Sequence, residues 1–306
     1  MTADSGKPSM NDGEFRMFAE LIRRDCGLHF GEETRFLLER RIERRMRERG
    51  VASYSAYHYE LRSSQNAGEL AQLIDEITTN ETYFFRERRQ LRALVTEIFP
   101  EAMLQDTRKG PITVWCAGCA SGEEPYSIAI LAQEAGMDPS RDLRVYASDI
   151  SRRMLQRARQ GTYREASFRE TEAALRERYF EEKDGVWKVC DEIKKLVDFM
   201  HLNLMDRSKV ALLGSMDVIL CRNVLIYFDH ESKRRVIETF EKKLRPGGHL
   251  LLGHSESLIN LSTSLELRHL KNDLVYRKPM PGLSTPDLWH AAASEAIASV
   301  EEEGGS

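Results

Sequence analysis

Long apolar runs are missing from this chain of 306 residues. Runs such as Ile128–Ala132 and Leu250–Leu252 span only a few residues, whereas a membrane-spanning helix needs about 20. Transmembrane segments and direct membrane insertion are therefore excluded. The first residues also lack the apolar core behind a basic start that marks a secretory signal, so we expect a cytoplasmic protein.

Cysteine is scarce, with five residues in the whole chain. In a protein without a secretory signal this number favours a reducing compartment and free thiols. Cys116 and Cys119 form a C-x-x-C pair, but Cys116 falls in a predicted strand and no second Cys or His pair has metal-ligand spacing. We therefore expect neither a metal site nor a redox pair.

Basic residues are absent after Lys278, and the segment 279–306 forms an acidic tail. The acidic residues of this tail account for the formal net charge of −4 of the whole chain, so the rest of the chain is near neutral. A near-neutral body argues against nucleic acid as a partner. Hydrophobic residues make up 41% and charged residues 31%, which is typical of a globular protein, and the length suggests about two domains.

Helical periodicity dominates the first part of the chain. Residues 1–13 are small and polar, and we expect them to be disordered. Four apolar stripes at helical spacing follow, at 15–22, 38–46, 54–61 and 70–77. They predict an all-α domain over 14–88, and 89–110 should contain a linking helix.

From residue 111 to 278, short β-prone runs alternate with helical patterns, which predicts an α/β domain with a parallel sheet. The segment about 165–196 breaks this alternation and reads as an inserted helix plus a β-hairpin that turns at Asp184-Gly185. The predicted strands are 112–116, 143–147, 197–200, 218–221, 249–253 and, as a final edge strand, 271–278.

The first predicted strand runs into a loop of small residues, and the whole segment 114–125 reads VWCAGCASGEEP. Small residues let the backbone approach a ligand at the carboxyl end of a strand. The loop has neither the dinucleotide pattern G-x-G-x-x-G nor the lysine of a phosphate-binding loop, and Glu123 and Glu124 would repel phosphates at a helix N-terminus. It suits a nucleoside ligand without phosphates. A plain tight turn is the alternative.

Three further segments could carry chemistry, each with a structural alternative. Asp149 ends the second strand, where an acid accepts hydrogen bonds from ribose hydroxyls, or it could cap a helix. The run 80–87 (NETYFFRE) joins the two parts and could be ligand-binding or interdomain packing. The run 221–229 (CRNVLIYFD) lies at a strand end, where α/β sheets bind ligands, or it could hold a solvated Arg and a capping Asn.

The helix predicted over 35–49 is strongly basic. Arg40, Arg44 and Arg47 share one face, opposite the apolar stripe. Such a face is usually solvated and held by ion pairs along the helix, but it could also dock an acidic partner.

Taken together, these segments resemble chemotaxis receptor methyltransferases of the CheR type over about residues 14–278. The resemblance lies in six blocks: ITTNETYFFRE (77–87), VWCAGCASGEEPYSIAI (114–130), ASDIS (147–151), HLNLMD (201–206), CRNVLIYFD (221–229) and LRPGGHLLLGHSESL (244–258). It implies a Rossmann-like class I methyltransferase domain with a small inserted β-subdomain, preceded by an all-α domain that docks the substrate. It also implies S-adenosylmethionine as cofactor, S-adenosylhomocysteine as product, and glutamate methyl esters on the cytoplasmic helical region of chemoreceptors.

The resemblance also implies roles for individual residues. Asn80, Thr82 and Arg86 would contact the methionine and sulfonium end of the ligand, and Asp149 would hold the ribose. The others are Glu124 in the loop, Asn203 and Leu204 beside the adenine, and Arg222 and Asn223 closing the pocket. We hypothesise that Arg86 and Tyr227 position the substrate glutamate. With receptors as substrates, docking becomes the favoured role for Arg40, Arg44 and Arg47.

One segment departs from the family pattern. Some members bind a tethering pentapeptide of the receptor through a longer, glycine-rich loop in the β-subdomain, whereas 180–187 here is short and has one glycine. We expect no such tether. Two alternatives stay open: a methyltransferase acting on another signalling protein, and a regulatory module that binds S-adenosylmethionine without turnover.

Overall fold

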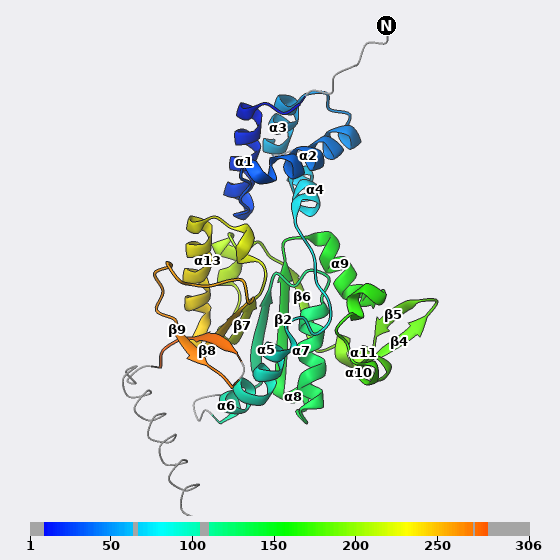
Figure 1. Ribbon diagram of the computed structural model, residues 1–306, viewed down its shortest axis with the longest axis vertical. Coiled ribbons are helices and arrows are strands. Elements are labelled where there is room, and N and C mark those ends of the chain that lie inside the picture. Colours follow the sequence, from blue (N-terminus) through cyan, green and yellow to red (C-terminus); the bar gives the residue numbers. More distant parts are fainter. Residues whose placement is uncertain (1–8, 64–66, 105–109, 272, 281–306) are drawn as a thin grey trace, which may run out of the picture.

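A computed structural model describes residues 9–63, 67–104, 110–271 and 273–280. A helical bundle stands at one end of a larger α/β domain, and a β-hairpin projects from the side of that domain (Figure 1). In the described residues no helix is long and apolar enough to cross a membrane.

The bundle consists of α1 (Asp12–Cys26), α2 (Arg35–Arg49), α3 (Tyr54–Arg62) and α4 (Ala67–Ile77), with a 3₁₀ turn at Glu32–Thr34. The apolar stripes of the four helices pack against one another around Phe18, Ile42 and Tyr57, which are fully buried. Gly27 and Gly50 end α1 and α2 with positive φ, as glycine allows at a helix C-terminus. The predicted all-α N-terminal domain is confirmed.

The predicted disordered segment, residues 1–13, extends too far along the chain. Asn11 caps α1 in a reciprocal capping box with Glu14, and Met10 is buried under the bundle. The backbone N–H of Met10 donates to Glu39 on α2 at 2.7 Å. Order therefore begins before α1, while residues 1–8 lie outside the described residues.

A continuous helical stretch leads from the bundle to the sheet. It comprises α5 (Arg88–Ala93), a π-helical turn at Leu94–Ile98 and α6 (Phe99–Met103). This is the linking helix predicted within 89–110; residues 105–109 lie outside the described residues.

The central sheet has seven strands in the order β6-β2-β1-β7-β8-β10-β9. The first five are parallel, and β10 pairs antiparallel with both β8 and β9. The strand bounds are β1 (Ile112–Ala117), β2 (Leu143–Asp149), β6 (Val197–His201), β7 (Met216–Cys221), β8 (Leu244–Leu252), β9 (Glu266–His269) and β10 (Leu274–Arg277). The predicted last strand is thus present but not at the edge, because β9, which the pattern did not reveal, covers it.

Both faces of the sheet are buried, as expected for parallel strands. Along β1, Val114 and Cys116 face one core that includes the linking helix, while Trp115 and Ala117 face a second core that includes Phe240. The flanking helices are α7 (Glu123–Glu134), α8 (Pro139–Asp142), α9 (Arg152–Gln160), α11 (Asp191–Lys194), α12 (Arg207–Ala211) and α13 (His230–Lys243).

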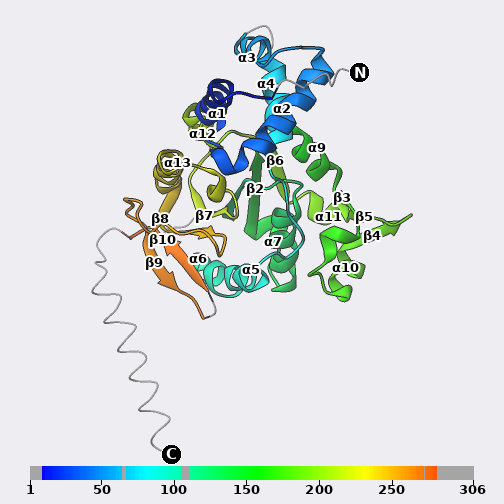
Figure 2. The same ribbon diagram turned by 45° about the horizontal axis from the view of Figure 1, so that its top comes forward.

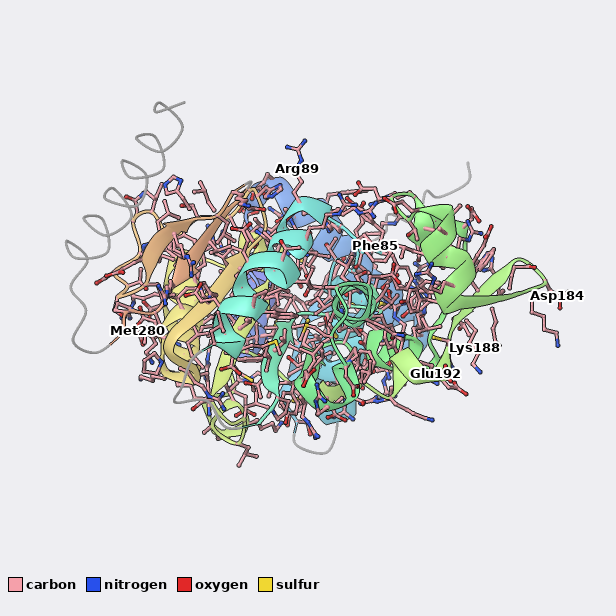
Figure 3. All side chains as sticks on the ribbon, turned by 90° about the horizontal axis from the view of Figure 1, so that it is seen from below. Phe85, Arg89, Asp184, Lys188, Glu192 and Met280 are labelled. Carbon is pink, nitrogen blue, oxygen red and sulfur yellow. The ribbon has the colours of Figure 1, made fainter. Side chains whose placement is uncertain are left out.

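The insertion between β2 and β6 contains β3 (Thr162–Tyr163), a 3₁₀ turn (Glu165–Phe168), α10 (Ala173–Tyr179), β4 (Phe180–Lys183) and β5 (Val186–Val189). The predicted helix and hairpin are both present, and the short β3 completes a three-stranded antiparallel sheet. Asp184 and Gly185 both have positive φ, as a two-residue hairpin turn requires. Asp184 marks the tip of the hairpin, on the opposite side of the molecule from Met280 (Figure 3).

Candidate active site

One pocket opens at the carboxyl ends of the central strands, beneath the helical bundle, which Figure 2 shows standing over this end of the sheet. The pocket holds about 950 Å³ of empty space, part of it open to solvent, which is enough for a nucleoside-sized ligand. All ten residues predicted to bind cofactor or substrate line it: Asn80, Thr82, Arg86, Glu124, Asp149, Asn203, Leu204, Arg222, Asn223 and Tyr227.

The loop after β1 forms the floor of the pocket. The backbone N–H groups of Gly118 and Cys119 donate to the carbonyl of Ser148 at 2.8 and 2.9 Å, which fastens the loop to the end of β2. Gly118 has a φ of 89°, and a Cβ there would lie 2.4 Å from Val224. The loop is therefore more than a tight turn, because glycine lets its backbone reach the pocket wall.

Asp149 is 7% exposed at the end of β2. Its carboxylate accepts from the backbone N–H groups of Ala120 and Ser151, both at 2.8 Å. Burial raises the pKa of this carboxyl, and the backbone donors oppose the rise. Ser151, not Asp149, caps α9, so the capping alternative is wrong. The carboxylate keeps lone pairs for two further donors, as a ribose diol would supply.

Arg222 is the centre of a buried charge cluster. Its side chain is 2% exposed and pairs with Glu87 at 3.1 Å and Glu124 at 3.2 Å. It also donates to the carbonyl of Arg86. Burial raises the pKa of Glu124, and the Arg222 cation lowers it. The alternative of a solvated arginine at this strand end is wrong. Arg222 holds the carbonyl of Arg86, the carboxylate of Glu87 and Glu124, which lies in the first turn of α7 and not in the loop before it.

The segment 80–87 combines packing with pocket lining. Phe84 and Phe85 are fully buried, and their backbone N–H groups donate to Ser167 and Ser127. Arg86 donates to the carbonyl of Glu81 at 3.0 Å and stacks near Tyr83, but no carboxylate in the described residues lies within ion-pair distance of it. Its charge is therefore available to a carboxylate that enters the pocket.

Asn203 and Tyr227 join the pocket to the bundle. The side-chain amide of Asn203 donates to the carbonyl of Asp25 at 2.6 Å and accepts from Met205. The carbonyl of Tyr227 accepts from the N–H of His29 at 2.8 Å, while its hydroxyl has no partner within the described part of the chain. Tyr227 thus has a fixed backbone and a free hydroxyl donor at the pocket.

The bundle also contributes pocket residues that the sequence pattern did not reveal. Cys26 and Leu28, at the end of α1, line the pocket, and Leu28 forms a β-bridge with Phe228. Neither residue type indicates ligand chemistry, and only the glycine that ends α1 marked this place. Four further lining residues lie in the blocks of the family resemblance but were assigned no role: Thr78, Thr79, Ile150 and Leu202.

Arg40, Arg44 and Arg47 lie on the bundle, outside the pocket, and all three are exposed. Arg44 pairs with Glu48 and Glu76, both at 3.2 Å, and Arg40 has no ion-pair partner in the described residues. Other arginines of α2 serve the bundle itself: Arg45 pairs with the buried Glu69 at 2.8 Å. The basic helix therefore divides into a structural side and an outward side.

The C-x-x-C pair is not arranged as a reactive thiol site. All five are unpaired, and Cys116 and Cys119 are buried in the cores. Burial raises the pKa of both thiols well above its usual range, which suppresses the reactive thiolate. The described ranges contain no cluster of His, Cys, Asp and Glu that could hold a metal ion.

Comparison with known proteins decides the family. Residues 80–273 match the SAM-binding domain of CheR methyltransferases, and residues 13–78 match their all-alpha domain. The chain belongs to the CheR methyltransferase family. It is 36% identical over 278 residues to Chemotaxis protein methyltransferase 2 of Vibrio cholerae, covering 90% of this chain and 96% of that protein. It is 35% identical over 265 residues to Chemotaxis protein methyltransferase of Escherichia coli, covering 85% of this chain and 90% of that protein.

Membership of the CheR methyltransferase family confirms the predicted fold class and makes S-adenosylmethionine the cofactor. Most residues that line the pocket belong to the family's SAM-binding domain, and they fit this ligand. Asp149 offers acceptors to hydroxyls, and Arg86 offers an unpaired cation. The side-chain oxygen of Asn223 is buried without a partner in the described structure. A buried acceptor of this kind needs a donor.

Proposed function

We propose that this chain methylates glutamate side chains of methyl-accepting chemoreceptors and forms glutamate methyl esters. The observation that carries the proposal is the pairing of Arg86, a cation without an acidic partner, with the free hydroxyl of Tyr227 in one pocket. A guanidinium and a hydroxyl are the donors that a carboxylate needs for orientation. The names of the relatives, chemotaxis protein methyltransferases, support the receptor as substrate.

Bound S-adenosylmethionine would supply an electrophilic methyl group on a positively charged sulfur. The glutamate oxygen would bond to the methyl carbon, and the sulfur would leave with the electron pair of the broken C–S bond. A glutamate is ionised at pH 7, since its usual pKa is about 4.3, so the chain needs no general base. The residues orient the carboxylate in line with the methyl group and exclude water. Because opposite charges neutralise each other in this step, exclusion of water from the pocket favours it.

We assign the ligand contacts to residues that line the pocket. Asp149 holds the ribose, Asn203 and Leu204 flank the adenine, and Asn80, Thr82 and Arg86 contact the methionine end. Arg222 contributes chiefly through Glu124 and the 86–87 backbone, because its own charge is already paired. Asn223 closes the pocket from the end of β7.

Receptor docking falls to the outward face of α2. Arg40, Arg44 and Arg47 supply positive charge, and the exposed Phe36 and Leu37 add apolar surface at the start of the same helix. This combination suits an acidic amphipathic receptor helix. The two-residue turn at Asp184-Gly185 leaves no extended loop for a receptor tether, so binding is tether-independent. The reaction takes place in the cytoplasm, without nucleic acid.

The function is tested by methyl transfer from radiolabelled S-adenosylmethionine to membranes that contain chemoreceptors, scored as base-labile methanol release. We expect label in receptor bands and its loss in Asp149→Ala. Label in another protein would show a different signalling substrate. Tight binding of the cofactor without transfer to any protein would show a regulatory module instead.

The roles at the reacting centre are tested with Arg86→Ala and Tyr227→Phe. We expect Arg86→Ala to lower turnover about 100-fold with the fold intact, since misorientation at the reacting centre costs a factor of this size. Arg89→Ala is the matched control, because Arg89 is an exposed arginine that points away from the body (Figure 3). Turnover near wild type in Arg86→Ala would show that the assigned role is wrong.

A further inference from the structure

A single carboxylate behind the pocket gathers four backbone N–H groups. Glu256 follows β8, and its Oε2 accepts from Asn223 at 2.7 Å and from Gly253 at 2.8 Å. Its Oε1 accepts from Val224 at 2.9 Å and from Ile226 at 3.2 Å. An ionised carboxylate has about four acceptor sites, so Glu256 is fully used. It does not line the pocket itself.

The segment that Glu256 holds is the wall of the pocket. Asn223, Val224 and Tyr227 all line it, within five consecutive residues. Asn223 has a φ of 59°, a left-handed conformation that asparagine adopts more readily than most non-glycine residues. Three of the four N–H groups on Glu256 belong to this segment, so Glu256 fixes the backbone of the pocket wall.

Close contacts on both sides fix the position of the segment that carries Asn223 and Val224. A Cβ at Gly253 would lie 2.8 Å from the side-chain nitrogen of Asn223 and 2.9 Å from Oε2 of Glu256. A Cβ at Gly118 would lie 2.4 Å from a methyl group of Val224. The segment is therefore confined between two glycines and tied by one carboxylate. A shift of the carboxylate displaces Asn223 and Val224 directly. Tyr227 follows, because its backbone N–H donates to the carbonyl of Val224 at 3.2 Å.

We propose that Glu256 is a positioning residue for methyl transfer: it fixes Asn223 against the cofactor and Tyr227 against the substrate carboxylate without touching either ligand. The part that concerns Tyr227 rests on the proposed function. The part that concerns Asn223 depends only on cofactor binding. Glu256 lies in the block 244–258, which the sequence marked without assigning a role.

The test compares Glu256→Gln with the wild type. The amide has nearly the same shape, but its one carbonyl oxygen can serve two N–H groups, and its NH₂ then faces the other two donors. We expect the dissociation constant for S-adenosylhomocysteine, measured by calorimetry, to rise about 10-fold, and kcat to fall about 100-fold, through displacement of the segment. Glu256→Asp keeps the charge, and we expect it to recover part of both losses.

Glu241→Gln is the matched control, because Glu241 also anchors a loop. Its carboxylate accepts from the side chain of Thr263 and from the N–H of Ser264 at 2.7 Å, away from the pocket. We expect Glu241→Gln to lower the thermal midpoint and to leave the dissociation constant and kcat unchanged. Amide exchange followed by mass spectrometry should rise at 223–226 only in Glu256→Gln.

The inference is overturned if Glu256→Gln shows wild-type affinity and kcat with a lowered midpoint, as a purely structural anchor would. It is also overturned if Glu256→Gln and Glu256→Asp lose affinity only in proportion to the fraction unfolded. A different result would refute the proposed function: wild-type protein that binds S-adenosylhomocysteine but transfers no label to any receptor. The role of Glu256 would then be judged on cofactor affinity alone.

Discussion

Removing the cation from the Arg222 cluster should destabilise the protein and the pocket together. In Arg222→Met the carboxylates of Glu87 and Glu124 are left in one site, with side chains only 13% and 16% exposed. Breaking a buried ion pair by removing one partner costs about 3–5 kcal/mol. Because both acids reach some solvent, we expect the lower value, about 3 kcal/mol, or a thermal midpoint about 6–12 °C lower.

Proton linkage gives this prediction a direction with pH. Burial already raises the pKa of Glu124, and loss of the neighbouring cation raises it further. A carboxyl whose pKa is higher in the folded than in the unfolded state binds more protons when folded, so stability rises as the pH falls through the folded pKa. The deficit of Arg222→Met against the wild type should therefore shrink between pH 8 and pH 5.

A second substitution separates stability from binding. Arg222→Met combined with Glu124→Gln leaves one carboxylate in the cluster, and we expect it to regain about 1–2 kcal/mol of the lost unfolding free energy. Affinity for S-adenosylhomocysteine should stay at least about 10-fold weak in both variants, because the 86–87 backbone has lost its anchor. Chemical denaturation and calorimetry measure the two quantities. Strictly additive losses in the double variant, or wild-type affinity in the single one, would refute the cluster as described.

Three further perturbations test separate parts of the molecule. Arg40→Glu should raise the receptor KM several-fold, more at low salt, and leave cofactor affinity unchanged, whereas Arg144→Glu, at the far end of β2, should change neither. Gly118→Ala should lower the free energy of unfolding, measured with denaturant, by about 2–4 kcal/mol, because the new Cβ meets the side chain of Val224. Gly50→Ala is the control, because Gly50 also has a positive φ but has open space around it. We expect it to cost only the backbone contribution, about 1 kcal/mol. Burial, with Arg268 and Arg277 nearby, lowers the pKa of His249 to about 3. The unfolded chain then binds the proton first as the pH falls, so the wild type should lose about 2 kcal/mol between pH 7.5 and pH 5, and His249→Gln should lack this loss.

Much of the site could be predicted because its residues sit at the ends of parallel strands. Strand ends of such a sheet meet at one edge, so Asp149 after β2 and Arg222 after β7 had to approach the loop after β1. The helix α2 was predicted with its observed bounds, Arg35–Arg49, because the apolar stripe ends at Gly50. Local patterns and topology were sufficient for these features.

The ion-pair and hydrogen-bond partners of individual side chains could not be predicted in the same way. The acids that pair with Arg222 lie 98 and 135 residues away in the chain, and residue type alone did not distinguish a buried cation from a solvated one. No role could be assigned to Glu256 from the sequence, because its hydrogen-bond partners are backbone N–H groups, which the amino-acid composition does not reveal. The strand β3 was missed because it contains two residues, too few for a period to show. The strand β9 was missed because its one apolar residue, Leu267, is exposed, so no apolar alternation marks it.

The bundle and the sheet domain act as one unit, because the bundle holds the pocket from two sides. On one side, Asp75 of α4 accepts from the side chain of Ser151 at 2.5 Å, next to the Asp149 that would hold the ribose. On the other, the N–H of His29 donates to the carbonyl of Tyr227. The same bundle carries the basic face of α2. A receptor helix docked on α2, as proposed, would therefore bind a bundle that contacts both the cofactor side and the substrate side of the pocket.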